Sequence, residues 1–256
     1  MTALEGVGIL VTRPEQQAMP LCRLLESAGA ITLRLAALEI KPVGARRAAP
    51  LPLERFDMIV FTSANAVRFG AALLEQRRDL KLAALGPATA RALNLAGYRV
   101  SVLPAERFDS EGLLSHPALQ HPQRRSVLIV KGVGGRELLE RELSGRGAEV
   151  TALAVYERVP AQVNAGALAA ASDAIESGSL HVVTATSLDT AAALLAPAWA
   201  PLRAGLERLH WLVPGGRVAA GIRGLEVSAP LIQAGSAEDQ SLLSALLAWR
   251  EAESGA

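Results

Sequence analysis

The chain has 256 residues, a formal net charge of +1 and a composition in which half of the residues are hydrophobic. This length suits one large or two small domains with a substantial core. The near-neutral charge excludes a whole-molecule field that would recruit nucleic acid or an anionic membrane. The longest apolar run, 190–202, is too short to span a bilayer. The single cysteine, Cys22, excludes a disulfide framework within the chain and favours a reducing compartment.

The first part of the chain is predicted to form a strand, a helix and a second strand. An apolar run at 8–11 has the length of a buried strand, and residues 17–27 carry apolar side chains at helical spacing. Gly29 ends this helix, and 31–40 is extended. The segment 41–52 is rich in Pro, Ala and Arg, which predicts a linker.

The rest of the chain continues the alternation of strands and helices. In the middle we expect strands at 56–61, 82–85, 99–103, 127–130 and 148–156. The helices expected between them lie at 66–76, from the loop 86–89 to Gly97, at 111–114 and at 136–143. The last part is expected to hold strands at 181–183, 210–213 and 226–228, and helices at 167–176, at 188–195, up to Gly224 and at 240–249.

A constant offset relates the first strand–helix–strand segment to the one that begins at 127. It places Leu10 on Leu128, Arg13 on Lys131, Gly29 on Gly147, Ala30 on Ala148 and Leu38 on Tyr156. Two later segments, 87–97 and 214–224, also match in length. We interpret these matches as an internal duplication.

Strands that alternate with helices predict parallel sheets covered by helices on both faces. The predicted strands suffice for two sheets of flavodoxin type. The expected fold is therefore α/β, with two flavodoxin-like parallel-sheet domains joined by a two-stranded β linker. The expected bounds are 1–36 with 163–256 for a discontinuous domain, 42–153 for a continuous inserted domain, and 37–41 with 154–162 for the linker strands.

The loops that follow the predicted strands supply the candidate site, because ligands of such sheets bind beyond the carboxyl ends of the strands. These loops offer hydroxyl groups, glycine backbone and two cations, which suit a large polyanion. The predicted binding residues are Thr12, Arg13, Ser63, Ala64, Asn65, Thr89, Lys131, Gly132, Gly134, Gly135, Thr184, Ser187, Gly215 and Gly216. Each hydroxyl or amide could instead cap a helix, which is the favoured role for Asn65 and Ser187.

The glycine-rich loop at 131–135 is expected to present backbone N–H groups to an anion at a helix N-terminus. It lacks the Gly-Lys-Ser/Thr sequence of a P-loop, and Glu137 stands where a dinucleotide fingerprint has its third glycine. A tight strand-to-helix turn is the alternative role for its glycines. The sequence contains no metal-ligand spacing, no paired carboxylates and no Ser/His/Asp set, so we expect no metal.

Four motifs occur in order along the chain: FTSANAV at 61–67, LGPATARAL at 85–93, DSEGLL at 109–114, and KGVGGRELLERELSGRGAEVTALAVYERV at 131–159. With them the chain resembles the uroporphyrinogen-III synthase family over nearly its whole length. The resemblance implies two flavodoxin-like domains joined by a two-stranded ladder. It also implies a cofactor-independent lyase (hydro-lyase) of tetrapyrrole, porphyrin and heme biosynthesis.

The implied substrate is hydroxymethylbilane, a linear tetrapyrrole that carries eight carboxylate side chains. The implied enzyme removes water, closes the ring and inverts the last pyrrole, which gives uroporphyrinogen III. Loss of the hydroxyl leaves an azafulvene cation. The substituted carbon of the terminal pyrrole attacks this cation, and the resulting spiro intermediate fragments and recloses.

The resemblance also assigns roles to individual positions. Tyr156 matches a tyrosine of the family and is the candidate catalytic proton donor, although a packing role at the hinge stays open. Thr89 matches a family threonine and is assigned to carboxylate binding. Its counterpart in the second half is Gly216, where some relatives keep threonine, so a hydroxyl is not essential there.

Two rival functions remain at this point. A non-enzymatic two-domain protein that binds or senses a small ligand would explain the paired sheets equally well. A two-domain sugar transferase is disfavoured because the sequence has no obvious carboxylate for a nucleotide ribose. We expect a cytoplasmic monomer without a cofactor, whose partner is a small linear tetrapyrrole and which binds no nucleic acid and no membrane.

Overall fold

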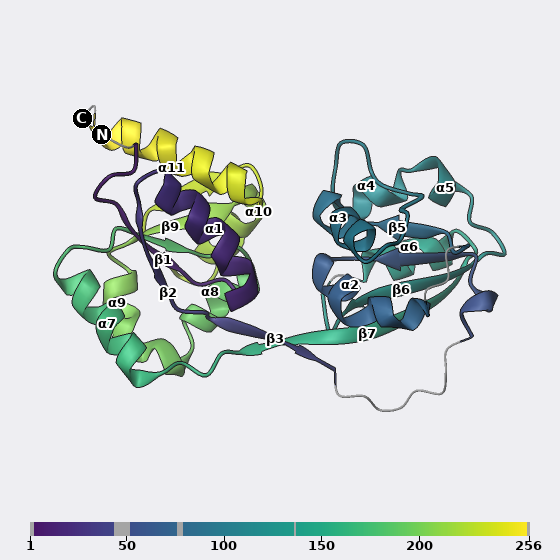
Figure 1. The fold of residues 1–256 in the computed structure, drawn as a ribbon, viewed down its shortest axis with the longest axis horizontal. Coiled ribbons are helices and arrows are strands. Elements are labelled where there is room, and N and C mark those ends of the chain that lie inside the picture. Colours follow the sequence, from purple (N-terminus) through teal and green to yellow (C-terminus); the bar gives the residue numbers. More distant parts are fainter. Residues whose placement is uncertain (1–2, 44–51, 76–78, 136, 255–256) are drawn as a thin grey trace. The chain divides into compact units, whose positions relative to one another are not determined.

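The structure is a computed structural model that describes residues 3–43, 52–75, 79–135 and 137–254. The chain divides into two compact units (Figure 1). Unit 1 consists of Met1–Glu39 and Val159–Ala256, and unit 2 of Ile40–Arg158. The chain passes between the units twice, once within strand β3 (Leu38–Pro42) and once within strand β7 (Glu149–Pro160).

Unit 1 contains a five-stranded sheet in which every pair of neighbours is parallel. Its strands, in the order of the sheet, are β10 (Leu231–Ala234), β9 (His210–Pro214), β8 (Val182–Thr184), β1 (Gly8–Val11) and β2 (Ile31–Arg34). Numbered along the chain, this order is 2-1-3-4-5, one of the two common orders of doubly wound sheets. The prediction of a parallel sheet is confirmed.

Helices cover both faces of this sheet, as Figure 1 shows. The helices are α1 (Glu15–Ser27), α7 (Ala165–Glu176), α8 (Leu188–Leu194), α9 (Arg203–Leu206), α10 (Gly215–Arg223) and α11 (Asp239–Ser254), with a 3-10 segment at Pro197–Leu202. Ile9 faces the side of α1 and α11, and Leu10 faces the side of α7 to α10. This alternation follows from the two-residue period of a strand and explains why β1 is apolar throughout.

Unit 2 contains a second sheet with four parallel strands and one antiparallel edge. Its order is β3, β7, β6 (Ser126–Gly132), β4 (Met58–Phe61) and β5 (Leu82–Ala84). Val43 N donates to Val155 O and Ala161 N donates to Ala37 O, so β3 runs antiparallel to β7. The helices are α2 (Ala64–Gly70), α3 (Pro87–Leu95), α4 (Ser110–Leu114), α5 (Pro117–Gln120) and α6 (Leu138–Gly145), with 3-10 segments at Leu53–Arg55 and Ala71–Leu74.

The two faces of the second sheet bury separate apolar clusters. Helices α2 and α3 pack with Phe61 and Val130 on one face, and α4, α5 and α6 pack with Val60 and Ile129 on the other. Together the two sheets give an α/β fold with two parallel-dominated sheets, as the sequence predicts. Within the described part of the chain, no helix is both long and apolar enough to cross a membrane.

The predicted duplication is visible in the segments β1-α1-β2 and β6-α6-β7. Gly8 pairs with Ile31 and Ser126 with Glu149, which is the same register at the predicted offset. Each helix ends at a glycine in the left-handed region, where φ is 97° at Gly29 and 86° at Gly147. The repeat therefore reproduces both the strand pairing and the turn that sets it.

The remaining strands follow the same correspondence with a different starting point in the chain. Strand β4 takes the place of β8, and β5 takes the place of β9. A single parallel bridge between Ala83 and Val102 stands where unit 1 has β10. Unit 2 thus has the strand order of unit 1 in circularly permuted form.

Several predicted elements differ from the observed ones. The strand expected at 99–103 is reduced to the Val102 bridge, because Pro104 follows and cannot donate to a ladder. No strand forms at 226–228, because Glu226 has φ 61° and lies in a turn, and β10 begins five residues later. The extended segment 31–40 is divided into β2 and β3. Much of the linker expected at 41–52 lies outside the described residues.

Candidate functional site

The predicted site residues fall into two groups, one on each sheet. In unit 1, positions at the carboxyl ends of β1, β8 and β9 are held by Thr12, Arg13, Thr184, Ser187, Gly215 and Gly216. In unit 2, positions at the ends of β4, β5 and β6 and on β7 are held by Ser63, Ala64, Asn65, Thr89, Lys131, Gly132, Gly134, Gly135 and Tyr156. Each group lies at the carboxyl ends of the strands of its sheet, which is where ligands of doubly wound folds bind.

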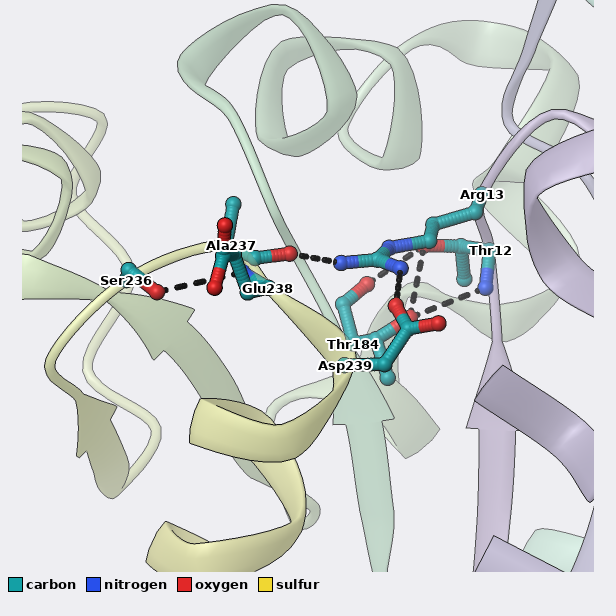
Figure 2. A network of polar contacts seen from close by, with 7 residues as sticks. All are labelled: Thr12, Arg13, Thr184, Ser236, Ala237, Glu238 and Asp239. Carbon is teal, nitrogen blue, oxygen red and sulfur yellow. Dashed lines mark hydrogen bonds and ion pairs between the residues drawn. The ribbon is translucent and has the colours of Figure 1, made fainter. Parts of the chain in front are cut away.

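Thr12 and Thr184 bind each other rather than presenting free hydroxyl groups (Figure 2). Both side chains are fully buried. Thr12 N donates to Thr184 Oγ1 at 3.0 Å, and the Thr12 hydroxyl donates to the Thr184 carbonyl. These bonds connect the ends of β1 and β8, so the two threonines stabilise the sheet edge.

The Arg13 guanidinium is held by the loop and first turn of α11 (Figure 2). It forms an ion pair with Asp239 and donates to the Ala237 carbonyl, and only 7% of the residue is exposed. The carboxylate of Asp239 therefore neutralises the cation that the sequence assigned to the ligand. Sequence reasoning placed a helix start in this region but missed this role of Asp239.

The other candidates of unit 1 lie at two helix starts. Ser187 caps α8, because its Oγ accepts from Thr190 N at 3.1 Å and lies 2.9 Å from Thr190 Oγ1. Gly215 and Gly216 open α10, and no described atom lies within 4 Å of the position of a Cβ at either residue. Their N–H groups belong to the first turn, which has no intrahelical acceptors. These glycines therefore offer free backbone donors.

Tyr156 and Ser63 lie together in unit 2. The two hydroxyl oxygens are 3.1 Å apart, and Arg158 Nη2 donates to the phenol oxygen at 3.5 Å. The ring lies 6.1 Å from that of Phe69, and Tyr156 is 3% exposed. Ser63 also accepts from Ala66 N at 3.0 Å as the N-cap of α2. A single serine thus connects the start of a helix to the phenol.

Gly132 makes room for the ring of Tyr156. A Cβ at Gly132 would lie 2.6 Å from Tyr156 Cζ, which no real side chain tolerates. The register of β6 against β7 shifts between Lys131 and Gly132, and Val133 N donates to Tyr156 O at 2.7 Å. The glycine predicted to approach a ligand therefore approaches the tyrosine that serves as candidate proton donor.

Lys131 is paired within its own unit. Its Nζ lies 2.5 Å from Glu140 Oε1, and the two side chains are 16% and 19% exposed. Glu140 stands in the first turn of α6, the helix that follows Lys131 in the chain. Like Arg13, this cation is neutralised by a carboxylate that sequence reasoning did not select.

The helix that follows Lys131 begins later than the sequence predicted. Its first residue is Leu138 instead of 136, and residue 136 lies outside the described part of the chain. Gly134 and Gly135 have φ 71° and 81° and precede the helix, so they form a turn rather than its first turn. The glycine loop was expected to form the N-terminus of the helix, but it forms an open turn before the helix. The helix start itself carries Glu137 and Glu140.

Thr89 differs from the other threonines of the candidate site. It is 4% exposed as a residue, yet its hydroxyl has no hydrogen-bond partner within the described part of the chain. It lies in the first turn of α3, which Gly86 caps with extended backbone. A buried threonine that keeps a free hydroxyl is suited to bind a ligand oxygen.

Phe108 lies beside this turn. A Cβ at Gly86 would lie 3.1 Å from Phe108 Cβ, and the phenylalanine is 49% exposed. Its neighbours Arg107 and Asp109 form an exposed ion pair at 2.8 Å. The hydrogen bond to Asp109 and its charge raise the pKa of Arg107 above its ordinary value. Phe108 is not among the predicted site residues, and in the sequence it directly precedes the DSEGLL motif.

Ala64 and Asn65 open α2, where Ala64 is exposed and Asn65 is half-buried. Their position beside Ser63 places them at the same sheet edge as Tyr156. Among the described residues, no group of three or more His, Cys, Asp or Glu side chains could hold a metal ion.

Comparison with known proteins finds a matching family model and several relatives. Residues 20–243 match a family model described as uroporphyrinogen-III synthase HemD. A uroporphyrinogen-III synthase of Escherichia coli is 33% identical over 163 residues, which cover 59% of this chain and 65% of the relative. One of Synechococcus elongatus is 31% identical over 201 residues, 73% of each chain. The alignment thus spans just under two thirds of the Escherichia coli relative.

Solved structures show the same fold. A mutant uroporphyrinogen III synthase of Thermus thermophilus matches 98% of this chain and all of its own with a TM-score of 0.62 and 21% identity. The enzyme of Helicobacter pylori matches 95% of this chain and 99% of its own with a TM-score of 0.59 and 16% identity. The family model covers most of the sequence, and the chain belongs to the uroporphyrinogen-III synthase family.

Proposed function

We propose that the protein is a uroporphyrinogen-III synthase. It would dehydrate linear hydroxymethylbilane and cyclise it with inversion of the terminal pyrrole ring. The observation that carries this proposal is the family match over 20–243, which includes every predicted site residue except Thr12 and Arg13. The free hydroxyl of Thr89 and the hydrogen-bonded phenol of Tyr156 support it.

The proposed architecture has two flavodoxin-like domains. Their bounds are 1–36 with 163–256 and 42–153, and 37–41 with 154–162 form a two-stranded linker. The antiparallel bonds between β3 and β7 support this assignment, because two paired extended segments form a short ribbon that can bend as a hinge.

Tyr156 is the proposed proton donor. The phenol oxygen accepts from Arg158 and has a second partner in Ser63, which leaves the phenol O–H free to donate when Ser63 donates its own proton. The bond between the methylene carbon and the hydroxyl breaks, its electron pair stays on oxygen, and the phenol proton completes the departing water. The pyrrole nitrogen supplies the electrons that form the azafulvene cation, and Arg158 stabilises the phenolate.

The later steps require that the substrate is held in the correct position, and they require no nucleophile from the protein. The pyrroles of the substrate are electron-rich, and the substituted carbon of the terminal ring attacks the cation. The enzyme must hold a flexible chain so that this carbon, and not its unsubstituted neighbour, reaches the electrophile. For the same reason the proposal includes no metal or organic cofactor.

Substrate carboxylates are assigned to neutral donors. We infer that the Thr89 hydroxyl and the backbone N–H groups of Gly134, Gly135, Gly215 and Gly216 bind them. Ala64 and Asn65 follow Ser63 at the start of α2, while Ser187 acts as a cap. Arg13 and Lys131 are assigned a structural role, in which their ion pairs hold the loops in position. The hydrogen bonds between Thr12 and Thr184 have the same role.

One assay tests the function. Purified protein is offered hydroxymethylbilane, and the ratio of type III to type I ring product is measured after oxidation to porphyrins. The proposal predicts mainly type III product, whereas uncatalysed closure gives type I. A protein that binds the bilane but leaves the product as type I would instead be a binding or sensor protein. We also propose that the enzyme works as a cytoplasmic monomer.

A further inference from the structure

A cavity lies at the amino ends of the strands of the unit 1 sheet. His181 stands just before β8 and His210 begins β9, so the cavity lies at the opposite end of the strands from Thr184. The cavity measures about 360 Å³, within the range typical of small-molecule sites. Its apolar lining includes Ile175 and Leu209, both buried.

Aromatic rings form one wall of this cavity. The rings of His210 and Trp249 have centroids 5.1 Å apart and are inclined by 55°. The indole N–H of Trp249 is buried and has no hydrogen-bond partner within the described residues. His181 accepts from Gly8 N at its Nδ1 at 3.1 Å, so in the neutral ring the proton is on Nε2. The wall therefore offers a flat apolar surface together with the Nε2–H group of His181 as a hydrogen-bond donor.

The rim of the cavity carries more positive than negative charge. Arg208 and Arg250 line it together with a single carboxylate, Glu253. Within the described part of the chain none of these three side chains has an ion-pair or hydrogen-bond partner. Guanidinium groups are suited to bind carboxylates through two parallel hydrogen bonds. Two unpaired arginines beside an aromatic wall therefore favour an anion with a flat apolar body.

We propose that this cavity binds a small aromatic carboxylate. The ring lies on the apolar floor against Trp249, and the carboxylate accepts from Arg208 and Arg250, with the Nε2–H of His181 as a further donor. The proposal does not depend on the proposed enzymatic function, because the cavity lies at the amino ends of the strands and the candidate site lies at their carboxyl ends. It assigns a second ligand site to unit 1.

The test uses benzoate as the probe and the indole N–H resonance of Trp249 as the reporter. The chain has three tryptophans, and Trp199 and Trp211 are buried, so a Trp249→Phe variant identifies the signal. Benzoate should shift it saturably, while benzylamine, a cation with the same ring, should not. The double variant R208Q/R250Q should bind benzoate about a hundredfold more weakly, since each of the two charge-assisted contacts contributes about tenfold.

Two controls separate the site from a general effect of charge or folding. Arg217→Gln removes an exposed arginine at the carboxyl edge of the same unit and should leave benzoate binding unchanged. The variant R208K/R250K keeps both charges but loses the paired guanidinium donors, so it should bind benzoate more weakly than the wild type and more tightly than R208Q/R250Q. The proposal is overturned by an absent or unsaturable shift, by an equal response to benzylamine, by undiminished binding to a folded R208Q/R250Q protein, or by loss of binding in Arg217→Gln.

Discussion

The two repeats β1-α1-β2 and β6-α6-β7 share a backbone but differ in their polar groups. Their strand registers and helix-ending glycines correspond at the same offset. At the position of Tyr156, however, unit 1 has the buried Leu38. Pro14, the N-cap of α1, stands where unit 2 has the glycine that admits the phenol ring. Duplication thus preserved the scaffold, and the candidate proton donor occurs in unit 2.

Arg13 and Lys131 occupy equivalent positions in the two repeats, but their ion pairs differ. Both are paired with carboxylates, but Asp239 comes from the far end of the chain and Glu140 from the next helix. In unit 1 the pair connects β1 to α11, which completes a unit built from two separate segments. In unit 2 the pair is local. We therefore expect the same kind of ion pair to matter more for folding in unit 1.

The largest change in stability is expected for Arg13→Ala. It removes a buried guanidinium together with its bonds to the partly exposed Asp239 carboxylate and to the Ala237 carbonyl, and the loss of two charge-assisted hydrogen bonds lowers the free energy of unfolding by about 3 kcal/mol. Urea denaturation measures the change. Arg107→Ala, at the exposed pair with Asp109, is the control and should have no measurable effect. Equal effects of the two variants would contradict the contrast between buried and exposed pairs.

Gly132→Ala should disturb both stability and activity. The added Cβ collides with the Tyr156 ring, so overpacking should lower the free energy of unfolding by about 1–3 kcal/mol. The displaced phenol should reduce kcat roughly tenfold or more. Gly145→Ala is the matched control, because no described atom lies near its Cβ position. A Gly132→Ala enzyme with normal kcat would show that the position of the phenol is unimportant.

Ser63→Ala and Ser187→Ala form a matched pair across the two units. Each serine caps a helix, and loss of a cap lowers the free energy of unfolding by about 1 kcal/mol. Only Ser63 also contacts the Tyr156 phenol. We expect similar losses of stability but a several-fold lower kcat for Ser63→Ala alone. If kcat falls equally in both variants, the contact between Ser63 and Tyr156 has no role in the reaction.

The smallest effect on catalysis is expected for Lys131→Ala. Because Glu140 already neutralises the ammonium, KM for hydroxymethylbilane should change by less than about twofold. Glu140→Gln is the companion variant, since it releases the lysine and should lower KM if the ammonium can then reach a substrate carboxylate. A several-fold higher KM for Lys131→Ala would restore Lys131 as a direct substrate ligand.

Sequence reasoning predicted the features that depend on local pattern. Short apolar runs indicated the parallel strands, and Gly29 and Gly147 marked the same turn in both repeats. The carboxyl edges of the sheets followed from topology alone. The helix start at Leu138 was missed because the glycine turn before it carries no capping serine or threonine.

Partners distant in the sequence were not predictable. Arg13 and Asp239 are 226 residues apart, and Ser63 and Tyr156 are 93 apart. A charge pattern cannot indicate such pairs, because they arise only when helices pack across different strands. For this reason the sequence assigned Arg13, Thr12 and Thr184 to the ligand, although each of them has a partner in its own unit. Lys131 was assigned to the ligand as well, although its partner Glu140 is only nine residues away in the sequence.

The central claim is that the phenol of Tyr156 donates the proton that releases water from the substrate. Single-turnover ring closure should be measured for Tyr156→Phe and for Tyr98→Phe, which alters the other tyrosine of the chain. We predict that Tyr156→Phe slows closure by about a hundredfold or more with little change in substrate affinity, as expected for loss of a general acid. Tyr98→Phe should close the ring at the normal rate. A folded Tyr156→Phe enzyme that closes the ring as fast as the wild type would contradict the claim.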